Sequence, residues 1–318
     1  MRESASNAQR GVSMVELMVA LTLGLLVGLA ATALLIMTKS AYVTQEEGSR
    51  LRETGRSAME AVSRAVRQAA HENWDREASA GVNDADLVDS ISGLDASSLK
   101  EYENGIDYPL ARSVNGSDVL AVRFTGSGLG PYGDETMFNC GGFGVAEVER
   151  GWSIFYVAAD KSGEPELRCK YRGVSNWNSE AIARGVESFQ ILYGIDSDTD
   201  GLPNRYVSAK SIEELDKTLV LAGPNAAARS LDKNRKTHWK KIVAVKIALL
   251  VRGSQNAKAA ASENRFDLFG KYYSDMHGAM DEGVSIDDSK LTAATRNRLR
   301  KIFTSTIHLR NQSGGGAT

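Results

Sequence analysis

Cysteine, proline and long apolar runs are all scarce in this chain of 318 residues. It has two cysteines and five prolines, against 30 glycines. The shortage of proline excludes a rigid proline-rich linker, whereas the glycines predict many turns. A net charge of −2 and a pI of about 6.2 exclude a global basic field that would attract nucleic acid. What remains is an ordinary folded chain with one unusual apolar segment.

Motifs that carry catalysis are also missing. The four histidines are spread along the chain without metal-ligand spacing. There is no Gly-x-Ser-x-Gly elbow, no phosphate-binding loop and no dinucleotide fingerprint. Acidic residues are abundant, but no pair of them is singled out for acid–base work. The chain is therefore predicted not to be an enzyme, and a single-pass, membrane-anchored extracytoplasmic enzyme is the most distant alternative.

Residues 12–37 form the one long apolar run, and Glu16 is its only charged residue. A helix of about 26 residues rises ~39 Å, enough to cross a bilayer core of ~30 Å with some tilt. A carboxylate in such a run costs ~2.5–3.5 kcal/mol at mid-membrane and less near an end. Glu16 lies in the first turn, where it would complement the helix dipole. The alternative is a glutamate that only snorkels to the membrane surface.

The residues before the run decide how it is processed. Residues 1–11 are short and polar, and the positive-inside rule places Arg2 and Arg10 in the cytoplasm. One interpretation is a secretory signal cut near residues 31–33, which would remove the helix. Against it, the apolar run continues past that point and Glu16 would interrupt the signal's core. The other interpretation is cleavage after Gly11, which keeps the helix.

The stretch Gly-Val-Ser-Met-Val-Glu-Leu-Met-Val-Ala, which begins at Gly11, resembles the processing signal of type IV prepilins and pseudopilins. The resemblance implies that a prepilin peptidase cuts behind Gly11, so that Val12 becomes the first mature residue and Glu16 the fifth. The family usually has Phe at the position of Val12. Cleavage would leave a cationic amine on Val12, at the i, i+4 spacing where opposite charges meet. The family also implies that Glu16 pairs with the terminal amine of a neighbouring subunit during assembly.

The helix is predicted to continue beyond the membrane through residues 38–72. Apolar or small residues recur there at steps of three and four, which is typical of an amphipathic helix. This stripe comprises Val43, Leu51, Gly55, Ala58, Met59, Val62, Ala65, Val66 and Ala69. In the membrane half, Gly24 and Gly28 form a small-xxx-small pair that would let another helix approach closely. The whole helix is expected to have about sixty residues, or ~90 Å.

Residues 73–318 are predicted to form an extracytoplasmic α+β domain. Strand patterns occur at residues 119–125, 145–149, 152–158, 167–172, 188–195, 242–252 and 303–310. The run 242–252 is the most apolar and is predicted to be a central strand. Helical patterns occur at residues 96–102, 211–221 and 292–302. A long helix followed by a succession of strands favours an antiparallel sheet packed on the helix.

Several stretches of the chain resemble the PilW family of type IV pilus minor pilins: residues 52–69, 192–206, 243–252 and 303–311. The resemblance implies a pilin-like fold and a subunit that helps to start pilus assembly, at the fibre tip. Its implied partners are prepilin peptidase, the other minor pilins, the major pilin, a tip adhesin and, before assembly, inner-membrane lipid. The implied location is a single pass through the inner membrane with a periplasmic domain, then the fibre at the cell surface. The alternative is a minor pseudopilin of a type II secretion system.

Cys140 and Cys169 fall in the part of the chain predicted to lie outside the cytoplasm, where thiols oxidise. A disulfide between them would close a ~30-residue loop and stabilise the fold by ~3.5 kcal/mol in the chain-entropy model. No Cys-x-x-Cys pattern points to redox or zinc chemistry instead. The sequence predicts a disulfide, with two free buried thiols as the alternative.

A stretch of alternating aspartates matches part of a calcium-binding loop. Side chains at its positions 1, 3, 5 and 9 and the carbonyl of position 7 could hold Ca²⁺. These residues are Asp196, Asp198, Asp200, Asn204 and Leu202. Position 12 of a complete loop is a glutamate, but here it is a valine. No cofactor is required in this interpretation; Ca²⁺ binding is a hypothesis, and a simple Asp/Gly turn between two strands is the alternative.

Two basic clusters could offer a surface for DNA. The first is Lys233, Arg235, Lys236, Lys240 and Lys241, and the second is Arg296, Arg298, Arg300 and Lys301. Clusters of this kind are more often a solvated rim than a binding site. Nucleic acid is therefore not predicted as a partner.

Overall fold

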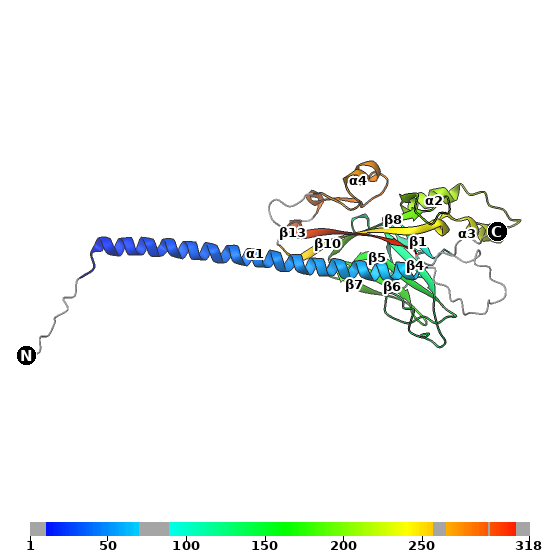
Figure 1. Ribbon diagram of the computed structural model, residues 1–318, viewed down its shortest axis with the longest axis horizontal. Coiled ribbons are helices and arrows are strands. Elements are labelled where there is room, and N and C mark those ends of the chain that lie inside the picture. The colour runs from blue at the N-terminus through cyan, green and yellow to red at the C-terminus, as the bar shows by residue number, and fades with distance from the viewer. Residues whose placement is uncertain (1–10, 70–88, 257–264, 292, 310–318) are drawn as a thin grey trace, which may run out of the picture.

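The computed structural model describes residues 11–69, 89–256, 265–291 and 293–309. A single helix, α1 (Met14–Gln68), contains 55 residues and stands out from a globular domain like a handle (Figure 1). Its first part has exposed apolar side chains, and it is long and apolar enough to cross a membrane. The membrane-spanning half and amphipathic half predicted from the sequence are therefore parts of one continuous helix.

The end of α1 differs slightly from the prediction of residue 72. The helix stops at Gln68, and Ala69 has a non-helical backbone with its side chain buried. Val66 and Ala69 are the last apolar residues of the buried stripe, and beyond them the sequence offers only small or polar residues before Trp74. The helix therefore ends where its buried apolar stripe ends.

Within the described residues, the globular domain contains two large antiparallel sheets and two small two-stranded ones. The larger one has the strand order β1-β4-β5-β6-β7, with β1 (Ile91–Leu94), β4 (Val119–Thr125), β5 (Arg150–Ala159), β6 (Pro165–Arg172) and β7 (Trp177–Arg184). Each strand of it pairs antiparallel with its neighbours. Together with α1 these sheets confirm the α+β class and the pilin-like plan expected from the sequence.

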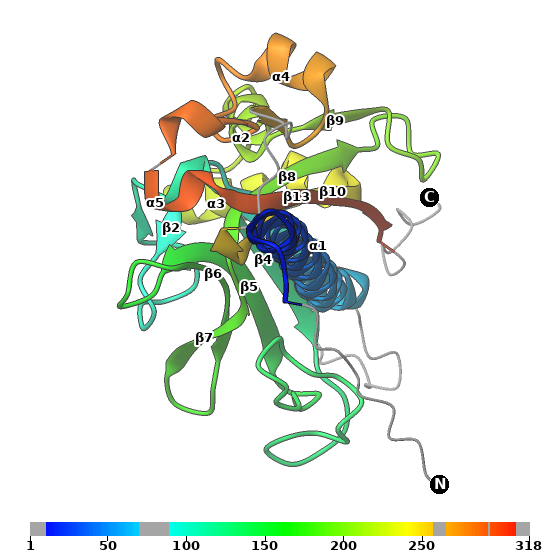
Figure 2. The same ribbon diagram turned by 90° about the vertical axis from the view of Figure 1, so that its left-hand side faces the viewer.

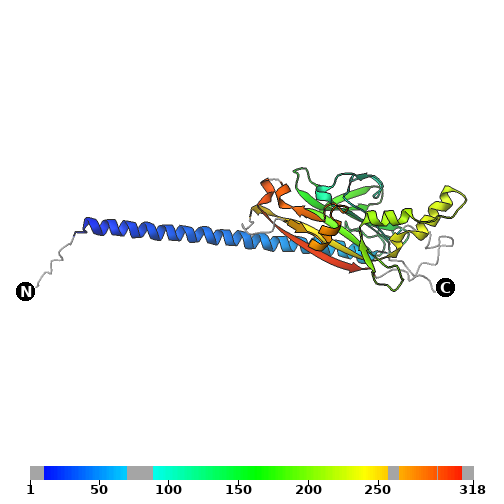
Figure 3. The same cartoon turned by 90° about the horizontal axis from the view of Figure 1, so that it is seen from above.

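The second sheet has the order β13-β10-β8-β9. Its strands are β13 (Arg298–His308), β10 (Ile242–Asn256), β8 (Val186–Ile195) and β9 (Arg205–Val207). β10 is flanked by β13 and β8 along most of its length, which confirms that the most apolar run is a central strand. Seen from above, these strands lie side by side and α1 runs beneath them (Figure 3).

Smaller elements lie around the two large sheets. They are the short strands β2 (Ser98–Leu99), β3 (Pro109–Leu110), β11 (Arg265–Asp267) and β12 (Ser285–Asp287), the helices α2 (Ala209–Lys217), α3 (Ala226–Lys236), α4 (Lys271–His277) and α5 (Ala293–Arg296), and three 3-10 turns, Val114–Gly116, His238–Lys241 and Asp288–Lys290. In Figure 3, α2 and α3 lie at the end of the domain remote from the N-terminus.

The main core forms where α1 meets both sheets. Viewed along its axis, α1 lies between the β13–β10 layer and the β4–β5–β6 layer (Figure 2). Leu51, Ala58, Val62 and Val66 of the helix are buried in one apolar cluster with residues of both sheets. At Gly55 the helix approaches β13 so closely that an added Cβ would lie 2.2 Å from the ring of Phe303. The predicted amphipathic stripe is thus the face that holds the domain on the helix.

Three sequence predictions for the domain were wrong. Residues 145–149 form a turn in which the Glu149 N–H bonds the Ala146 carbonyl, so Val145 and Ala146 are buried without a strand while Val148 is exposed. Residues 96–102 hold the short β2 instead of a helix, and Ala96 has a positive φ of 47°, which a helix cannot accommodate. From Arg298 onward, residues predicted as helix belong to β13, because they pair with β10.

Candidate functional site: the helix start and its attachment to the domain

The start of α1 is fixed by Ser13 and Glu16. Ser13 is the N-cap residue, and its Oγ accepts a hydrogen bond from the Val15 N–H at 3.3 Å. In return the Glu16 carboxylate accepts the Ser13 N–H at 2.9 Å, which completes a capping box. Gly11 and Val12 lie before the helix. The sequence singled out Gly11, Val12 and Glu16 but overlooked Ser13, which the Ser-x-x-Glu pattern could have revealed.

Gly24 and Gly28 lie on one face of the exposed half of α1. A side chain built at either glycine would meet nothing within 4 Å. With Leu17, Leu21 and Thr32 they line a shallow groove that runs along the helix. A groove of small residues lets another helix come close, so this face is suited to the helix packing that the sequence predicted.

Glu47 fastens α1 to the domain just beyond the exposed half of the helix. Although charged, it is almost completely buried, and its carboxylate accepts hydrogen bonds from the backbone N–H and the hydroxyl of Ser254 at 2.8 and 3.0 Å. Gly253 makes this approach possible, because a Cβ there would lie 2.7 Å from a Glu47 carboxylate oxygen. The sequence carries no signal of this contact, since its two sides are more than 200 positions apart.

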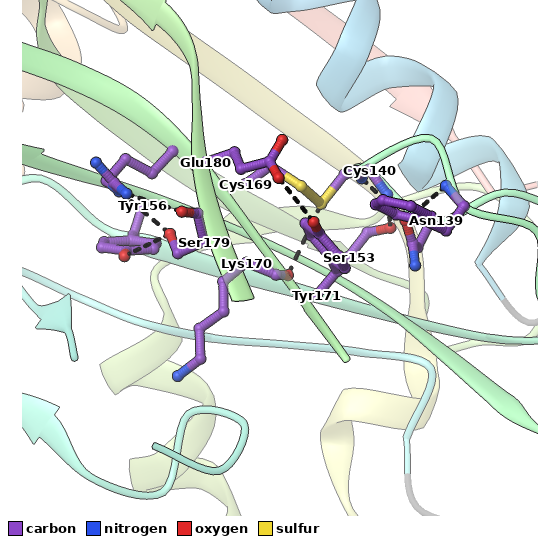
Figure 4. Close-up of a disulfide and its surroundings, with 12 residues drawn as sticks. Asn139, Cys140, Ser153, Tyr156, Cys169, Lys170, Tyr171, Ser179 and Glu180 are labelled. Carbon is purple, nitrogen blue, oxygen red and sulfur yellow. Dashed lines mark hydrogen bonds between the residues drawn. A yellow bond between two sulfur atoms is a disulfide. The ribbon is translucent and has the colours of Figure 1, made fainter. Parts of the chain in front are cut away.

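Cys140 and Cys169 form the predicted disulfide, with Cα atoms 5.9 Å apart. It joins the long loop before β5 to strand β6 (Figure 4). The same loop is held by the Cys140 N–H, which donates to the Ser153 hydroxyl at 2.9 Å, and by Asn139, whose side-chain oxygen accepts the N–H groups of Gly141 and Phe143. The bond therefore fixes a loop that has little regular structure of its own.

The aspartate loop follows β8 as predicted. Carboxylate oxygens of Asp196, Asp198 and Asp200 lie within 4.8 Å of one another. Asp196 already accepts backbone N–H groups from Asp198, Thr199 and Gly201. Burial would raise the pKa of Asp196, but these donors outweigh it and lower the pKa overall.

Asn204 is oriented differently from a calcium ligand. Its side-chain oxygen accepts the N–H and hydroxyl of Ser197 at 2.6 and 2.8 Å, and its amide donates to Asp198. Leu202 is exposed. The structure thus brings the three aspartates together, while the amide oxygen of Asn204 is engaged within the turn.

Arg300 of the second basic cluster is not part of a solvated rim, whereas Arg296 and Lys301 are exposed. The Arg300 side chain is fully buried and pairs with Glu187 at 2.6 Å and Asp288 at 3.5 Å. Arg252 pairs with both Glu187 and Glu164. Because Glu164 lies between β5 and β6, these charges connect the two sheets. Residues of the first cluster lie on α3, which has no buried residue, and on the 3-10 turn after it.

A group of acidic side chains is buried between β8 and the segment around α4. Asp118 accepts the N–H groups of Ala96 and Ile191, and burial followed by the charges of Asp95 and Asp281 raises its pKa well above the usual value. Burial also raises the pKa of Asp281 to about 6, although Tyr273 donates a hydrogen bond to it at 2.8 Å. The sequence gave no signal for this group, because its members come from separate loops.

These features define a class of protein: one in which a long N-terminal helix, exposed and apolar over its first part, carries an α+β head. Comparison with known families agrees with that class. The profile described as type IV pilus-assembly protein W matches residues 154–311, and the prokaryotic N-terminal methylation motif matches residues 6–32. The chain belongs to the type IV pilus-assembly protein W (PilW) family.

Two further comparisons add little. No curated protein matches the chain. Among solved structures it is similar to "Type IV-like pilin TTHA1219 from Thermus thermophilus", with 13% identity and a TM-score of 0.35 over 83% of this chain and 98% of that one. At this TM-score the family assignment rests on the two sequence matches. The longer match describes a pilus-assembly protein, so the chain is a pilus-related minor pilin.

Proposed function

We propose that the chain is a minor pilin that starts type IV pilus assembly, at the fibre tip, after a prepilin peptidase cuts behind Gly11. The observation that carries the proposal is the start of α1. A Gly–Val bond precedes the helix, Glu16 lies in its first turn, and an exposed apolar half follows. Before assembly this half is held in inner-membrane lipid, with residues 1–11 in the cytoplasm and the domain of residues 73–318 in the periplasm.

In the fibre, the apolar half of α1 packs against other minor pilins and the major pilin. The face that carries Gly24 and Gly28 admits a neighbouring helix, and the Glu16 carboxylate pairs with the Val12 amine of a neighbour. The domain sits beside a tip adhesin and is held on the helix by the apolar stripe that α1 buries between Leu51 and Val66. Nothing in this role requires an enzymatic step.

Deletion of the gene tests the assignment against the alternative of a type II secretion pseudopilin. A minor pilin predicts loss of surface fibres and twitching, with secretion of exoproteins unchanged. Complementation with Glu16→Gln should restore a processed protein but not fibres, because the amide still fits the capping box yet carries no charge to pair with an amine. Loss of exoprotein secretion with fibres intact would favour the pseudopilin instead.

We further propose that the aspartate loop binds Ca²⁺, with Asp196, Asp198 and Asp200 as ligands. The convergence of their oxygens supports this, and Asn204 would have to turn away from Ser197 to join them. Calorimetry of the full chain in detergent should give heat with Ca²⁺ for wild type and for Asp134→Ala, an aspartate in an unrelated turn, but not for Asp198→Ala. No heat with wild type would end the hypothesis.

A further inference from the structure

The bond between Gly11 and Val12 lies immediately outside α1. The first backbone hydrogen bond at the start of the helix runs from the Leu17 N–H to the Ser13 carbonyl at 3.1 Å. Ser13 itself has an extended backbone (φ −66°, ψ 144°). Among the described residues, none donates a hydrogen bond to the Gly11 carbonyl. The bond is therefore presented on non-helical chain.

A helix continued backward would cover this carbonyl. In an α-helix the N–H of residue i bonds the carbonyl of residue i−4. The Val15 N–H would then bond the Gly11 carbonyl. In the structure the Ser13 hydroxyl takes that N–H, and the Glu16 carboxylate takes the Ser13 N–H. The capping box thus uses the donor that would otherwise close a helical turn over the Gly11–Val12 bond.

We infer that Ser13 is a positioning residue for leader cleavage: its hydroxyl stops α1 short of the Gly11–Val12 bond and leaves the Gly11 carbonyl open to the peptidase. This inference rests on the proposed cleavage behind Gly11. In the reaction, water adds to the Gly11 carbonyl and the C–N bond to Val12 breaks. Gly11 leaves as a carboxylate, and the Val12 nitrogen takes up both protons of the water to become the new cationic amine.

The experiment follows the precursor and the mature form of the full chain in cells that contain the peptidase, by pulse labelling and gel mobility. Ser13→Thr and Ser13→Val form a matched pair, because the two side chains have the same shape and differ only in the hydroxyl. Removing an N-cap oxygen changes the equilibrium between a helix that begins after Ser13 and one that extends further back by about a factor of five. Ser13→Val and Ser13→Ala should therefore be cut about five-fold more slowly than wild type.

Ser13→Thr should be cut at nearly the wild-type rate, since threonine also caps helices. Thr22→Ala is the control: its hydroxyl donates to the Val19 carbonyl within α1 and does not cap the helix, so cleavage should be unchanged. Membrane fractionation shows whether each precursor is inserted.

Two outcomes would overturn the inference while cleavage of wild type continues. One is equal rates for Ser13→Val and Ser13→Thr, which would mean that side-chain shape matters and the hydroxyl does not. The other is a normal rate for Ser13→Ala. If the wild-type chain itself is never cut behind Gly11, the proposed processing fails as well, and the two failures are thereby distinguished.

Discussion

Arg300 is a fully buried cation, held between Glu187 and Asp288. Removing one member of such a group leaves an uncompensated buried charge, which usually costs several kcal/mol. Arg300→Met keeps most of the volume but removes the guanidinium. We expect a loss of roughly 3 kcal/mol in the free energy of unfolding, at the lower end of the usual range because Arg252 still pairs with Glu187.

Denaturant unfolding of the full chain in detergent measures this loss. Lys217→Ala, which breaks the exposed pair with Glu214, is the matched control and should leave stability almost unchanged. If both variants unfold at the same denaturant concentration as wild type, the buried charges do not hold the two sheets together.

Asp281 makes stability depend on pH. Its folded-state pKa is raised from 3.8 to about 6, by burial first and the charge of Asp95 next, while the Tyr273 hydrogen bond acts in the opposite direction. The folded chain thus holds this proton more tightly than the unfolded one. Its contribution to stability is full below pH ~4 and is lost as the pH rises through 6, by roughly 3 kcal/mol.

Asp281→Asn removes this titration and still accepts the Tyr273 hydroxyl. Relative to wild type, the variant should gain stability between pH 4 and pH 7. The measurement is the free energy of unfolding of both proteins across that range. Parallel pH profiles would show that Asp281 ionises at its ordinary pKa in the folded protein.

How far single residues could be predicted depended on the distance between partners in the sequence. Glu16 and the two cysteines stood out, because a charge in an apolar run and a lone cysteine pair are local or compositional signals. Arg300 was misassigned to a solvated helix, since its partner Glu187 is more than 100 positions away. Ser13 was overlooked although its partner Glu16 is only three residues away.

At the scale of elements, the contact between α1 and β13 depends on Gly55. Its hydrogen faces the ring of Phe303, and a methyl group there would overlap the ring. Alanine is otherwise favoured over glycine inside a helix by ~1 kcal/mol. We expect Gly55→Ala nevertheless to destabilise the domain by about 1–3 kcal/mol, as overpacking does.

Gly48→Ala provides the control in the same helix, because a Cβ there meets its nearest atoms only at 3.9 Å. It should be neutral or stabilising. Thermal unfolding of both variants in detergent checks the difference, and Phe303→Leu combined with Gly55→Ala should recover part of the loss. Similar unfolding temperatures for the two glycine variants would contradict the close packing.

Elements with strong apolar patterns could be predicted, and elements held by distant contacts could not. β4, β5, β8 and β10 each contain a run of large apolar residues that identifies them, and β6 alternates Leu167, Cys169 and Tyr171 with charged residues. β7 is an edge strand with many polar residues, and α3 has no buried residue, so neither gives a periodic signal. β13 was predicted from residue 303, but its first part is polar and owes its conformation to β10.

At the scale of the whole molecule, the proposed function gives the two parts different roles. The helix enters lipid and then the fibre, and the head is carried on the helix. Contacts at Glu47 and Gly55 and in the core between the sheets fix α1 to the head. The exposed half has no partner within the described chain, and its apolar face is therefore available to a membrane or to neighbouring helices.

The central claim is that this half begins a mature protein at Val12. N-terminal sequencing and intact-mass measurement of the chain purified from membranes of cells that make pili test it most directly. The account predicts a start at Val12, with residues 1–11 removed. A chain that still begins at Met1, or one that begins at Leu34 after loss of the apolar helix, would contradict it.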